Sequence, residues 1–574
     1  MKKIIFGVIA ALSLIVTSCS DFLDRAPKDA LSPSTFWQSE DDAYLALIGT
    51  YNGLNNIYHN GHWTGYNCIM MDALSDNLFD YFSWEGYNVL TTGNITPSNN
   101  GVAGSFFNFS DIRACNEYLE NEGNINWTTS GLEDQYKAEV RTIRALLYLY
   151  RTNWYGDFPL ITKTMSLEDS YNQARTPVAE VHKFIESELK ECIEALPTRA
   201  QVTQGRICKE FAQGLLMRYY LWNSDYADAR TYAKAIVDEG NLSLSSDYES
   251  MFELSNQYDN ETIFDFSFIA NTDRDLYGNP FVANGALGGW SSIVPTVDLM
   301  DEFECTDGKT IDESSLYDPT HPFLNRDPRL RVTMVYPGQV YTGYTDSQNG
   351  CYNSLSPTIN GNNNLDYWNN AGNASKSGLQ LGKYFLASNV TSSGLSHMSA
   401  HFKVMRYAEV LLTLAECDIE LGNLDEGVKY LNMVRRRAGM PDVAVTDQET
   451  LRAQVRRERR VELAGEGLRR EDMVRWQVDA NGKWVASGGT PYIVWKFQHD
   501  YCIEHLDGYI ENYKDANGDW VAHVTGRTGG GHNAPQTAFA RENFETFTAK
   551  NIYWPISQST IDTNPALTQT EGYK

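Results

Sequence analysis

Apolar side chains recur at steps of three and four over several long stretches of this chain. One stretch covers residues 133–154, where the recurring positions are Tyr136, Val140, Ile143, Leu147 and Tyr150. This spacing places them on one face of a helix. A second helix is predicted after Thr176-Pro177, with Thr176 as the N-cap and Pro177 at the first helical position, and it ends before Pro197.

Two pairs of shorter amphipathic helices follow the same pattern. The first pair covers residues 211–220 and 226–237, with a turn at Asn223-Ser224-Asp225. The second covers residues 410–415 and 428–434, with a turn at Leu421-Gly422-Asn423. Alanines at the contact and a short polar turn are typical of tetratricopeptide-like hairpins, which bury their apolar faces by stacking on neighbours. The stretch between the pairs predicts that an insert interrupts this stack.

That insert, residues 241–400, has a different pattern. It is rich in Gly, Asn, Ser, Pro and aromatic residues, and Asn360–Asn373 has the composition of a loop with Tyr367-Trp368 at its centre. Loops on a rigid scaffold are the usual place for binding residues. We therefore predict a mainly α fold, in which tetratricopeptide-like hairpins form a scaffold for a large loop-rich insert and a few short β-hairpins.

A short repeat near the C-terminus predicts two of those β-hairpins. Residues 479–486 read DANGKWVA and residues 515–522 read DANGDWVA. Asn-Gly between strand-forming residues favours a two-residue turn. The spacing of Asp515, Asn517 and Asp519 resembles the start of a calcium-binding loop. However, Trp520 stands where such a loop needs Gly, so we do not expect calcium here.

The N-terminus carries the signs of export. Lys2-Lys3 precede a short apolar run over residues 4–16, which is typical of a secretory signal and too short to span a membrane. The following Thr17-Ser18-Cys19 resembles the lipobox of bacterial lipoproteins, in which the cysteine is lipidated after cleavage. We expect a lipid on Cys19 to tether the protein. The alternative is a soluble secreted protein in which Cys19 has no such role.

These features divide the chain into five parts. We assign residues 1–18 to a lipoprotein signal peptide and 19–38 to an N-terminal tether. Residues 39–240 form an N-terminal helical region, and 241–400 form the loop-rich insert. Residues 401–574 form a C-terminal region with a helical hairpin, the β-hairpins and a final segment.

Charge and cysteine content narrow the classes of function. The chain of 574 residues holds 47 Lys and Arg against 74 Asp and Glu, a net charge of −27. Because nucleic-acid binding needs a basic surface, nucleic acid is excluded as a partner. The acidity also argues against strongly sulfated or uronate-rich polymers. Besides Cys19, eight cysteines lie at wide and irregular spacings, and we interpret them as buried free thiols.

One basic segment stands out against this acidic background. Arginines cluster at residues 435–437 and 455–463, where acidic residues interleave with them. A polyanion site is one interpretation. Arg459/Glu462 and Arg469/Asp472, however, have the i,i+3 spacing of paired charges on a helix. We therefore favour a structural network of ion pairs.

No motif for catalysis, cofactor binding or metal binding is present. The chain lacks GxSxG, HExxH, the P-loop and GxGxxG patterns. Acidic pairs such as Asp301/Glu302 could be drawn as glycosidase carboxylates, but chance supplies such pairs among 74 acids. We expect no catalytic residue, no metal and no cofactor other than the lipid on Cys19. A glycoside hydrolase remains a distant alternative.

The order of short motifs along the chain resembles the SusD/RagB lipoproteins of the Bacteroidetes. The motifs, from N- to C-terminus, are DFLDRAP at 21–27, LSPSTFW at 31–37, RTIRALLY at 141–148, NWYGDFP at 153–159, RDPR at 326–329, RYAEVLL at 406–412, ERRVELAGE at 458–466, and YWPI at 553–556 with Asn564-Pro565. Each motif is modest alone, but their order and spacing together are specific.

This resemblance implies a fold and a role. Members of the family are helical proteins that face the cell exterior at the outer membrane. They bind glycans, or peptides in some branches, and deliver them to a SusC-like TonB-dependent transporter without catalysing a reaction. The resemblance carries over no ligand-binding residue, because the family's ligand face varies. A peptide-binding or protein-binding protein of the same architecture remains the alternative to a glycan-binding one.

Physical chemistry must therefore choose the candidate ligand residues. The apolar faces of sugars stack on aromatic rings, and their hydroxyls need polar partners. Aromatic residues in Gly- and Asn-rich segments are the candidates, and core packing is the alternative for each. They are Trp63, Tyr66, Trp84, Tyr87, Tyr277, Trp290, Tyr367 and Trp368. We expect at least two of Trp84, Trp290 and Trp368 to line the ligand site.

Overall fold

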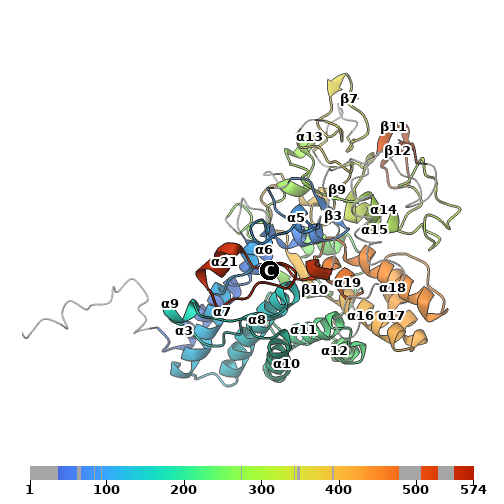
Figure 1. The fold of residues 1–574 in the computed structure, drawn as a ribbon. Coiled ribbons are helices and arrows are strands. Elements are labelled where there is room, and N and C mark those ends of the chain that lie inside the picture. The colour runs from blue at the N-terminus through green and yellow to red at the C-terminus, as the bar shows by residue number, and fades with distance from the viewer. Residues whose placement is uncertain are drawn as a thin grey trace, which may run out of the picture.

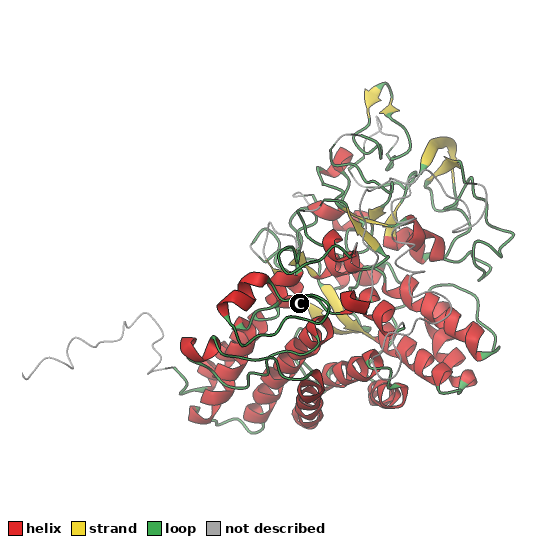
Figure 2. Ribbon diagram, viewed as in Figure 1, coloured by secondary structure: helices red, strands yellow, loops and turns green. Residues whose placement is uncertain are grey.

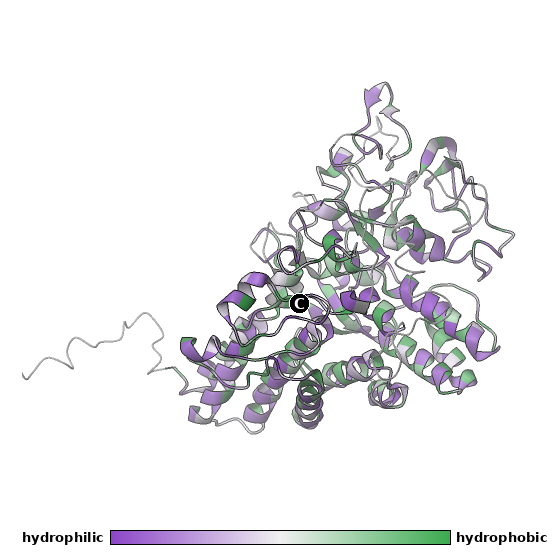
Figure 3. Cartoon of the chain, viewed as in Figure 1, coloured by the Kyte–Doolittle hydropathy of each residue, from purple (hydrophilic) through white to green (hydrophobic). Residues whose placement is uncertain are grey.

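A curved array of helices carries a loop-rich upper part in the computed structural model of this chain (Figures 1 and 2). The structure describes residues 36–476, 506–527 and 549–574, apart from short gaps at 61–65, 83, 92, 273, 342, 345–349, 371 and 391–393. The scaffold helices carry both hydrophilic and hydrophobic residues, as amphipathic helices do (Figure 3). The predicted fold class is confirmed.

The N-terminal part of the array is built around one long helix. This helix, α8 (Leu132–Tyr155), packs against α3 (Glu40–Asn52), α7 (Ser110–Asn121) and α10 (Val178–Ala195). The predicted cap of α10 is wrong. Pro177 itself occupies the N-cap, and Asp157 Oδ1 accepts the hydrogen bond of the Val178 N–H at 2.8 Å. The side chain of Asp157, from another loop, therefore caps the helix in place of Thr176.

The two tetratricopeptide-like hairpins are confirmed, and they stack directly on each other. The first comprises α11 (Lys209–Trp222) and α12 (Tyr226–Glu239), and the second comprises α16 (Tyr407–Glu420) and α17 (Leu424–Arg437). Helix α12 packs against α16. The contact arises because β4 (Thr262–Phe266), after the first hairpin, pairs antiparallel with β10 (Phe402–Arg406), before the second. The chain between these strands leaves the scaffold and returns to it.

The loop-rich part is held by short antiparallel strand pairs. They are β3 (Leu78–Asp80) with β5 (Ile293–Pro295), β6 (Met334–Val335) with β9 (Gln380–Leu381), and β7 (Thr358–Ile359) with β8 (Asn362–Asn363). Two short helices, α14 (Val297–Glu302) and α15 (Arg329–Thr333), contribute to a second, smaller apolar core. Among the described residues, this core is separate from the large core of the scaffold.

The remaining elements are short or lie at the C-terminal side. They are α4 (Asn55–Tyr58), β1 (His59–Asn60), β2 (Tyr66–Asn67), α5 (Asn88–Thr91), α6 (Ala103–Phe106), α9 (Leu167–Ser170), α13 (Asn284–Leu287), α18 (Gln448–Leu463), α19 (Arg469–Arg475) and α21 (Gln558–Thr563). None of the helices in the described ranges is both long and apolar enough to cross a membrane.

One of the two predicted β-hairpins lies within the described residues. It is formed by β11 (Asp507–Lys514) and β12 (Trp520–Thr525), which turn at residues 515–519. Asp515 Oδ1 accepts hydrogen bonds from the backbone of Asn517 and Asp519, and the carboxylate of Asp519 pairs with Arg331. The acidic side chains therefore cap a turn. The hairpin predicted at residues 479–486 lies outside the described residues.

The arginine-rich segment forms a buried network of ion pairs, as predicted. Arg437 contacts the carboxylates of Glu261 and Glu462, and Arg406 of β10 joins the same network through Glu261, Glu462 and Glu466. The predicted helical pairs are wrong, however. Arg459 pairs with Asp472 at 3.0 Å, and Arg469 pairs with Asp76 at 2.8 Å. These partners come from other elements because the arginines point into the protein, where a charge needs a partner within the core.

The described cysteines are buried free thiols, as predicted. They are Cys68, Cys115, Cys192, Cys208, Cys305, Cys351 and Cys417. Burial raises the pKa of Cys192 to about 11 and that of Cys351 to about 12, so both stay as thiols at neutral pH. Cys19 and Cys502 lie outside the described residues.

Candidate functional site

The pairing of β3 with β5 brings two distant aromatic loops together. Asp80 lies opposite Ile293 in this register. The pairing extends one step further, since the Tyr81 N–H donates to the Ser292 carbonyl at 2.8 Å. The loop after β3 carries Trp84, and the loop before β5 carries Trp290. Two residues that are about 200 positions apart in sequence are thereby placed side by side.

The aromatic rings form a continuous row, which we call the aromatic ridge and define as Phe82, Trp84, Trp290, Tyr277 and His397. Ring centroids along this row are separated by 6.4 Å, 6.0 Å, 5.5 Å and 5.6 Å. The indole planes of Trp84 and Trp290 are inclined at 67°. Trp84 is 59% exposed, the only tryptophan of the described residues with an exposed side chain. The ridge thus presents an apolar face to solvent.

Trp290 owes its position to the two preceding glycines. Gly288 ends α13 with φ at +67°, a backbone conformation that glycine adopts without strain. A Cβ on Gly289 would lie only 2.0 Å from the carbonyl oxygen of Val282. Only glycine therefore lets the chain pass this carbonyl and turn the indole toward Trp84. The Trp290 side chain is partly exposed in this position.

The other end of the ridge is fixed by a second backbone contact. Leu276 and Met398 exchange hydrogen bonds of 2.9 Å and 3.1 Å, which places Tyr277 beside His397. His397 Nδ1 lies 2.6 Å from a carboxylate oxygen of the buried Asp275. The hydroxyl of Tyr277 accepts a hydrogen bond from the Asn279 side chain at 3.1 Å. Polar groups therefore stand beside the rings at this end.

Tyr367 and Trp368 lie on a neighbouring loop that Lys376 connects to the start of the ridge. The Lys376 ammonium lies 5.1 Å from the Tyr81 ring centroid and donates to the carbonyl of Trp368 at 3.3 Å. Tyr81 in turn packs edge-on against Phe82. The Trp368 indole N–H donates a hydrogen bond to Asp507 Oδ1 of β11 at 2.8 Å. Trp368 is therefore half-buried and held in place rather than free at a surface.

The structure separates the predicted site residues into four groups, of which one is the pair Tyr367 and Trp368 on the neighbouring loop. It brings Trp84, Trp290 and Tyr277 together in the ridge, although Tyr277 is only 7% exposed. Tyr87 is a correction: it is 0% exposed and packs in the scaffold core, so its ring has no face for a ligand. Trp63 and the side chain of Tyr66 lie outside the described residues.

Sequence reasoning missed Phe82, His397 and Lys376. Phe82 lies beside Trp84 in the same aromatic segment, and this proximity was a signal for it. His397 and Lys376 are far from the other ridge residues in sequence. Only the Leu276–Met398 contact and the Lys376–Tyr81 contact reveal them, and neither has a local sequence pattern.

A buried acidic pair, Asp80 and Glu85, flanks Trp84 in the sequence. Asp80 and Glu85 are 1% and 2% exposed. Asp80 Oδ2 accepts the backbone N–H groups of Tyr87 and Asn88, and Ser292 donates its hydroxyl to Glu85 Oε1 at 2.7 Å. Burial, together with the negative charge of Asp80, raises the pKa of Glu85 to about 9. Glu85 is therefore neutral at pH 7, and this loop adds less negative charge than its sequence suggests.

A polar cavity of about 640 Å³ lies elsewhere, between residues 323–332, 246–249 and the turn of β11–β12. Its aromatic residues are Tyr248, Phe323 and Tyr336, each less than 10% exposed. Three of its arginines pair with carboxylates, as Arg331 does with Asp519 at 2.7 Å, and the fourth, Arg326, donates to backbone carbonyls. The cavity thus offers neither an open ring face nor an unpaired Arg331 charge. We assign the candidate site to the ridge.

Comparison with known proteins shows which family the sequence and the fold resemble. The sequence model of the SusD family matches residues 248–573. A SusD-like protein of Bacteroides ovatus is 24% identical over 98% of this chain and 96% of its own length. The starch-binding protein SusD of Bacteroides thetaiotaomicron is 23% identical over 84% and 92% of the two chains. A crystal structure of a SusD-like carbohydrate-binding protein from Bacteroides fragilis is 28% identical, with a TM-score of 0.71 over 93% of this chain and all of that one.

Proposed function

Since this chain belongs to the SusD family, we propose that it is a non-catalytic, cell-surface lipoprotein that captures a glycan and delivers it to a SusC-like TonB-dependent transporter of the outer membrane. The observation that carries the glycan part is the exposed Trp84 indole, which projects from a row of rings with polar neighbours. An indole that remains in water gains free energy when the apolar face of a sugar covers it.

The ridge favours a neutral glycan whose chain turns. Two indole planes at 67° cannot both stack on sugar rings that lie in one plane. Successive sugars that rotate relative to each other can contact Trp84 and then Trp290. Hydroxyl groups at the other end would reach the Asn279 amide and the His397 imidazole. The acidic net charge of the chain disfavours polyanionic glycans.

Several features support binding without catalysis. Glycosidases need two accessible carboxyl groups that flank the scissile bond. The acidic pair nearest the exposed indole, Asp80 and Glu85, is almost fully buried. Proteins that resemble this chain carry names for carbohydrate binding, such as the relatives from B. thetaiotaomicron and B. fragilis.

The experiment measures the affinity of purified mature protein for a panel of neutral glycans by affinity gel electrophoresis and calorimetry. Trp84→Ala and Trp290→Ala should each weaken binding at least about tenfold, which corresponds to about 1.4 kcal/mol. The matched control is Tyr171→Ala, which removes an exposed ring from the helical scaffold. Unchanged binding in Trp84→Ala, Trp290→Ala and Trp368→Ala would reject this site.

Two further arms test the rest of the proposal. Binding of peptide pools but of no glycan would replace the glycan by a peptide ligand, and sugar release by purified protein would reject the non-catalytic role. Cys19→Ala should abolish lipid labelling and surface attachment. Co-purification of a TonB-dependent transporter with the lipidated protein, from detergent-solubilised outer membranes, would support the delivery step.

A further inference from the structure

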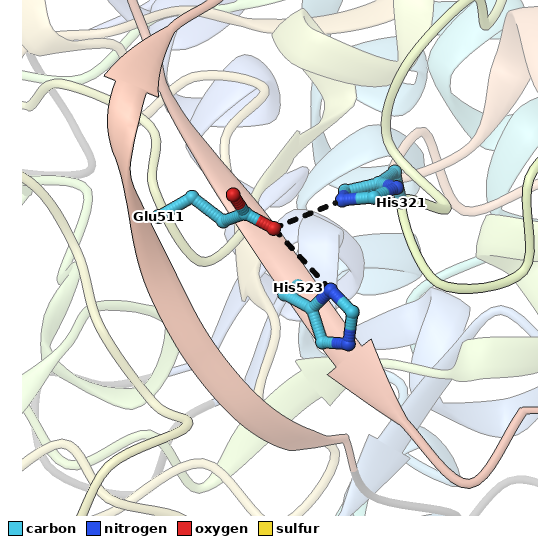
Figure 4. A group of neighbouring side chains, drawn as sticks. All are labelled: His321, Glu511 and His523. Carbon is cyan, nitrogen blue, oxygen red and sulfur yellow. Dashed lines mark hydrogen bonds and ion pairs between the residues drawn. The ribbon is translucent and has the colours of Figure 1, made fainter.

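Two histidines and one glutamate converge on the hairpin β11–β12, outside the aromatic ridge (Figure 4). Glu511 belongs to β11, His523 to β12, and His321 to a loop of the insert. The Glu511 Oε1 atom lies 3.2 Å from Nε2 of His321 and 3.3 Å from Nδ1 of His523. One donor atom from each of the three residues lies within 4.8 Å of the other two.

We propose that His321, Glu511 and His523 bind one Zn²⁺ ion. Imidazole nitrogen and carboxylate oxygen are zinc donors, with bonds of about 2.0–2.2 Å. Neighbouring donors of a tetrahedral site are then about 3.3 Å apart. Both distances to Glu511 Oε1 agree with this spacing. Three protein donors leave the fourth position for water or a ligand atom, and the three side chains are 19–25% exposed, so an ion can reach them.

The backbone builds this convergence. Tyr509 lies opposite His523 in the strand register, which places them on the same part of the hairpin. Glu511 lies two residues beyond Tyr509 on β11, so the alternation of side chains along a strand places it on the same face as Tyr509 and His523. The Val524 N–H donates to the Thr320 carbonyl at 2.8 Å and so brings His321 to the hairpin.

Both imidazoles are oriented by neighbours, as zinc ligands usually are. Asp318 Oδ2 lies 2.7 Å from Nδ1 of His321. A proton on Nδ1 satisfies this carboxylate and leaves the lone pair of Nε2 directed toward Glu511. The Tyr509 ring stacks on the His523 ring at 4.7 Å with an interplanar angle of 16°. Both histidine ligands are therefore held in place before an ion binds.

His523 supplies an independent observation. Its Nδ1 atom is buried and makes no hydrogen bond within the described part of the chain, although it lies 3.3 Å from Glu511 Oε1. A buried polar atom without a hydrogen bond is costly. A cation between the three side chains satisfies this atom together with His321 Nε2 and the carboxylate.

Zinc at this position would connect two distant parts of the sequence. His321 belongs to the insert, whereas Glu511 and His523 belong to the C-terminal hairpin. The same strand β11 begins with Asp507, which holds the indole of Trp368. Bound zinc should therefore stiffen the hairpin and the loop of Trp368, and this effect does not depend on the proposed glycan function.

The experiment uses the tag-free mature protein after treatment with EDTA and dialysis. Competition with a chromogenic zinc chelator should show one Zn²⁺ per chain, and Co²⁺ should give the intense visible absorption of a tetrahedral site. Glu511→Gln and His523→Ala should lower zinc affinity about 100-fold or more, and Asp318→Asn about 10-fold, since Asp318 acts only through His321. Zinc should raise the Tm of the wild type but not that of Glu511→Gln.

The matched control is His401→Gln, because His401 also pairs with a carboxylate, that of Asp265 at 2.9 Å, but belongs to no three-residue cluster among the described residues. This variant should bind zinc like the wild type. Wild-type affinity no higher than that of Glu511→Gln would overturn the proposal, as would an equal loss in His401→Gln. Circular dichroism shows whether each variant folds. If His523→Ala fails to fold, Glu511→Gln still tests the proposal, because it preserves the volume of the side chain.

Discussion

The arginine network of the scaffold and the aromatic ridge both gather one kind of side chain, but the network buries its arginines whereas the ridge exposes a tryptophan. In the network, Arg406 is fully buried and contacts three carboxylates, so none of its charge is available to an external anion. In the ridge, Trp84 remains 59% exposed. A clustered residue type indicates a binding site only when its binding surface reaches solvent.

Tryptophan itself shows the same contrast within one chain. Trp154 in α8 is completely buried, donates its indole N–H to Glu471 at 3.1 Å and stacks on Trp554. Trp84 has the same side chain on a loop, where it stacks on Phe82 and lies at a steep angle to Trp290 but stays 59% exposed. The scaffold thus uses tryptophan for volume and hydrogen bonding, whereas the ridge leaves much of the Trp84 side chain in solvent.

The largest effect should come from breaking the network. Arg406→Met leaves the buried carboxylates Glu462 and Glu466 without this partner, so we expect a loss of about 3–5 kcal/mol in the free energy of unfolding. Urea denaturation measures it. Arg436→Met, which removes the exposed pair with Asp442, should cost much less, because solvent screens this pair. Equal costs in the two variants would contradict the distinction between buried and exposed pairs.

A smaller loss is expected where the backbone supports the ridge. Gly289→Ala places a methyl group against the Val282 carbonyl, and the shift that follows should cost about 2 kcal/mol. The same shift should move Trp290 and weaken glycan binding. The control is Gly123→Ala, because a Cβ there meets no atom within 4 Å and the φ of Gly123 is not positive. This variant should leave stability and glycan affinity unchanged. Normal stability and affinity in Gly289→Ala would show that the loop adapts.

The two regions should also differ in their response to pH. Burial alone would raise the pKa of Glu462, but Arg437, Arg406 and Arg329 outweigh it and lower this pKa, so the network loses stability as pH falls. Glu85 behaves in the opposite way. Its folded-state pKa of about 9 lies above its ordinary value of 4.5, so its contribution is complete below pH 4.5 and is lost as pH rises toward 9.

Glu85→Gln isolates this second response. The amide stays neutral, so the fall in unfolding free energy between pH 5 and pH 9 should become shallower, and the difference between variant and wild type should grow as the pH rises. Chemical denaturation at several pH values measures the slope. A variant with the same slope as the wild type would show that Glu85 is not the group that titrates.

The smallest effect on stability should come from the ridge surface. Trp84→Ala removes an exposed ring, and we expect a change below about 0.5 kcal/mol in the free energy of unfolding. Trp154→Ala, by contrast, should cost about 3–5 kcal/mol. Thermal and urea denaturation compare the two. If Trp84→Ala is strongly destabilising, this indole supports the fold and the ridge is not a free binding surface.

Local patterns predicted the helices well and the caps less well. The apolar spacing over residues 133–154 and the turns at residues 223–225 and 421–423 correspond to α8 and to the two helical hairpins. The cap of α10 was mispredicted because Asp157, the residue that satisfies the Val178 N–H, comes from another loop. Ion pairs failed in the same way, since Arg459 and Arg469 have partners outside their own helix turn.

The sequence alone determined the helical scaffold, the loop-rich insert and one β-hairpin, because periodicity, turn residues and short motifs act between neighbours in the chain. Only the tertiary structure decided which aromatic residues come together in the candidate site. The β3–β5 pairing brings Trp84 to Trp290, and the Leu276–Met398 contact brings Tyr277 to His397. It also buries Tyr87 and gathers His321, Glu511 and His523. Burial and proximity depend on long-range packing, which no local pattern records.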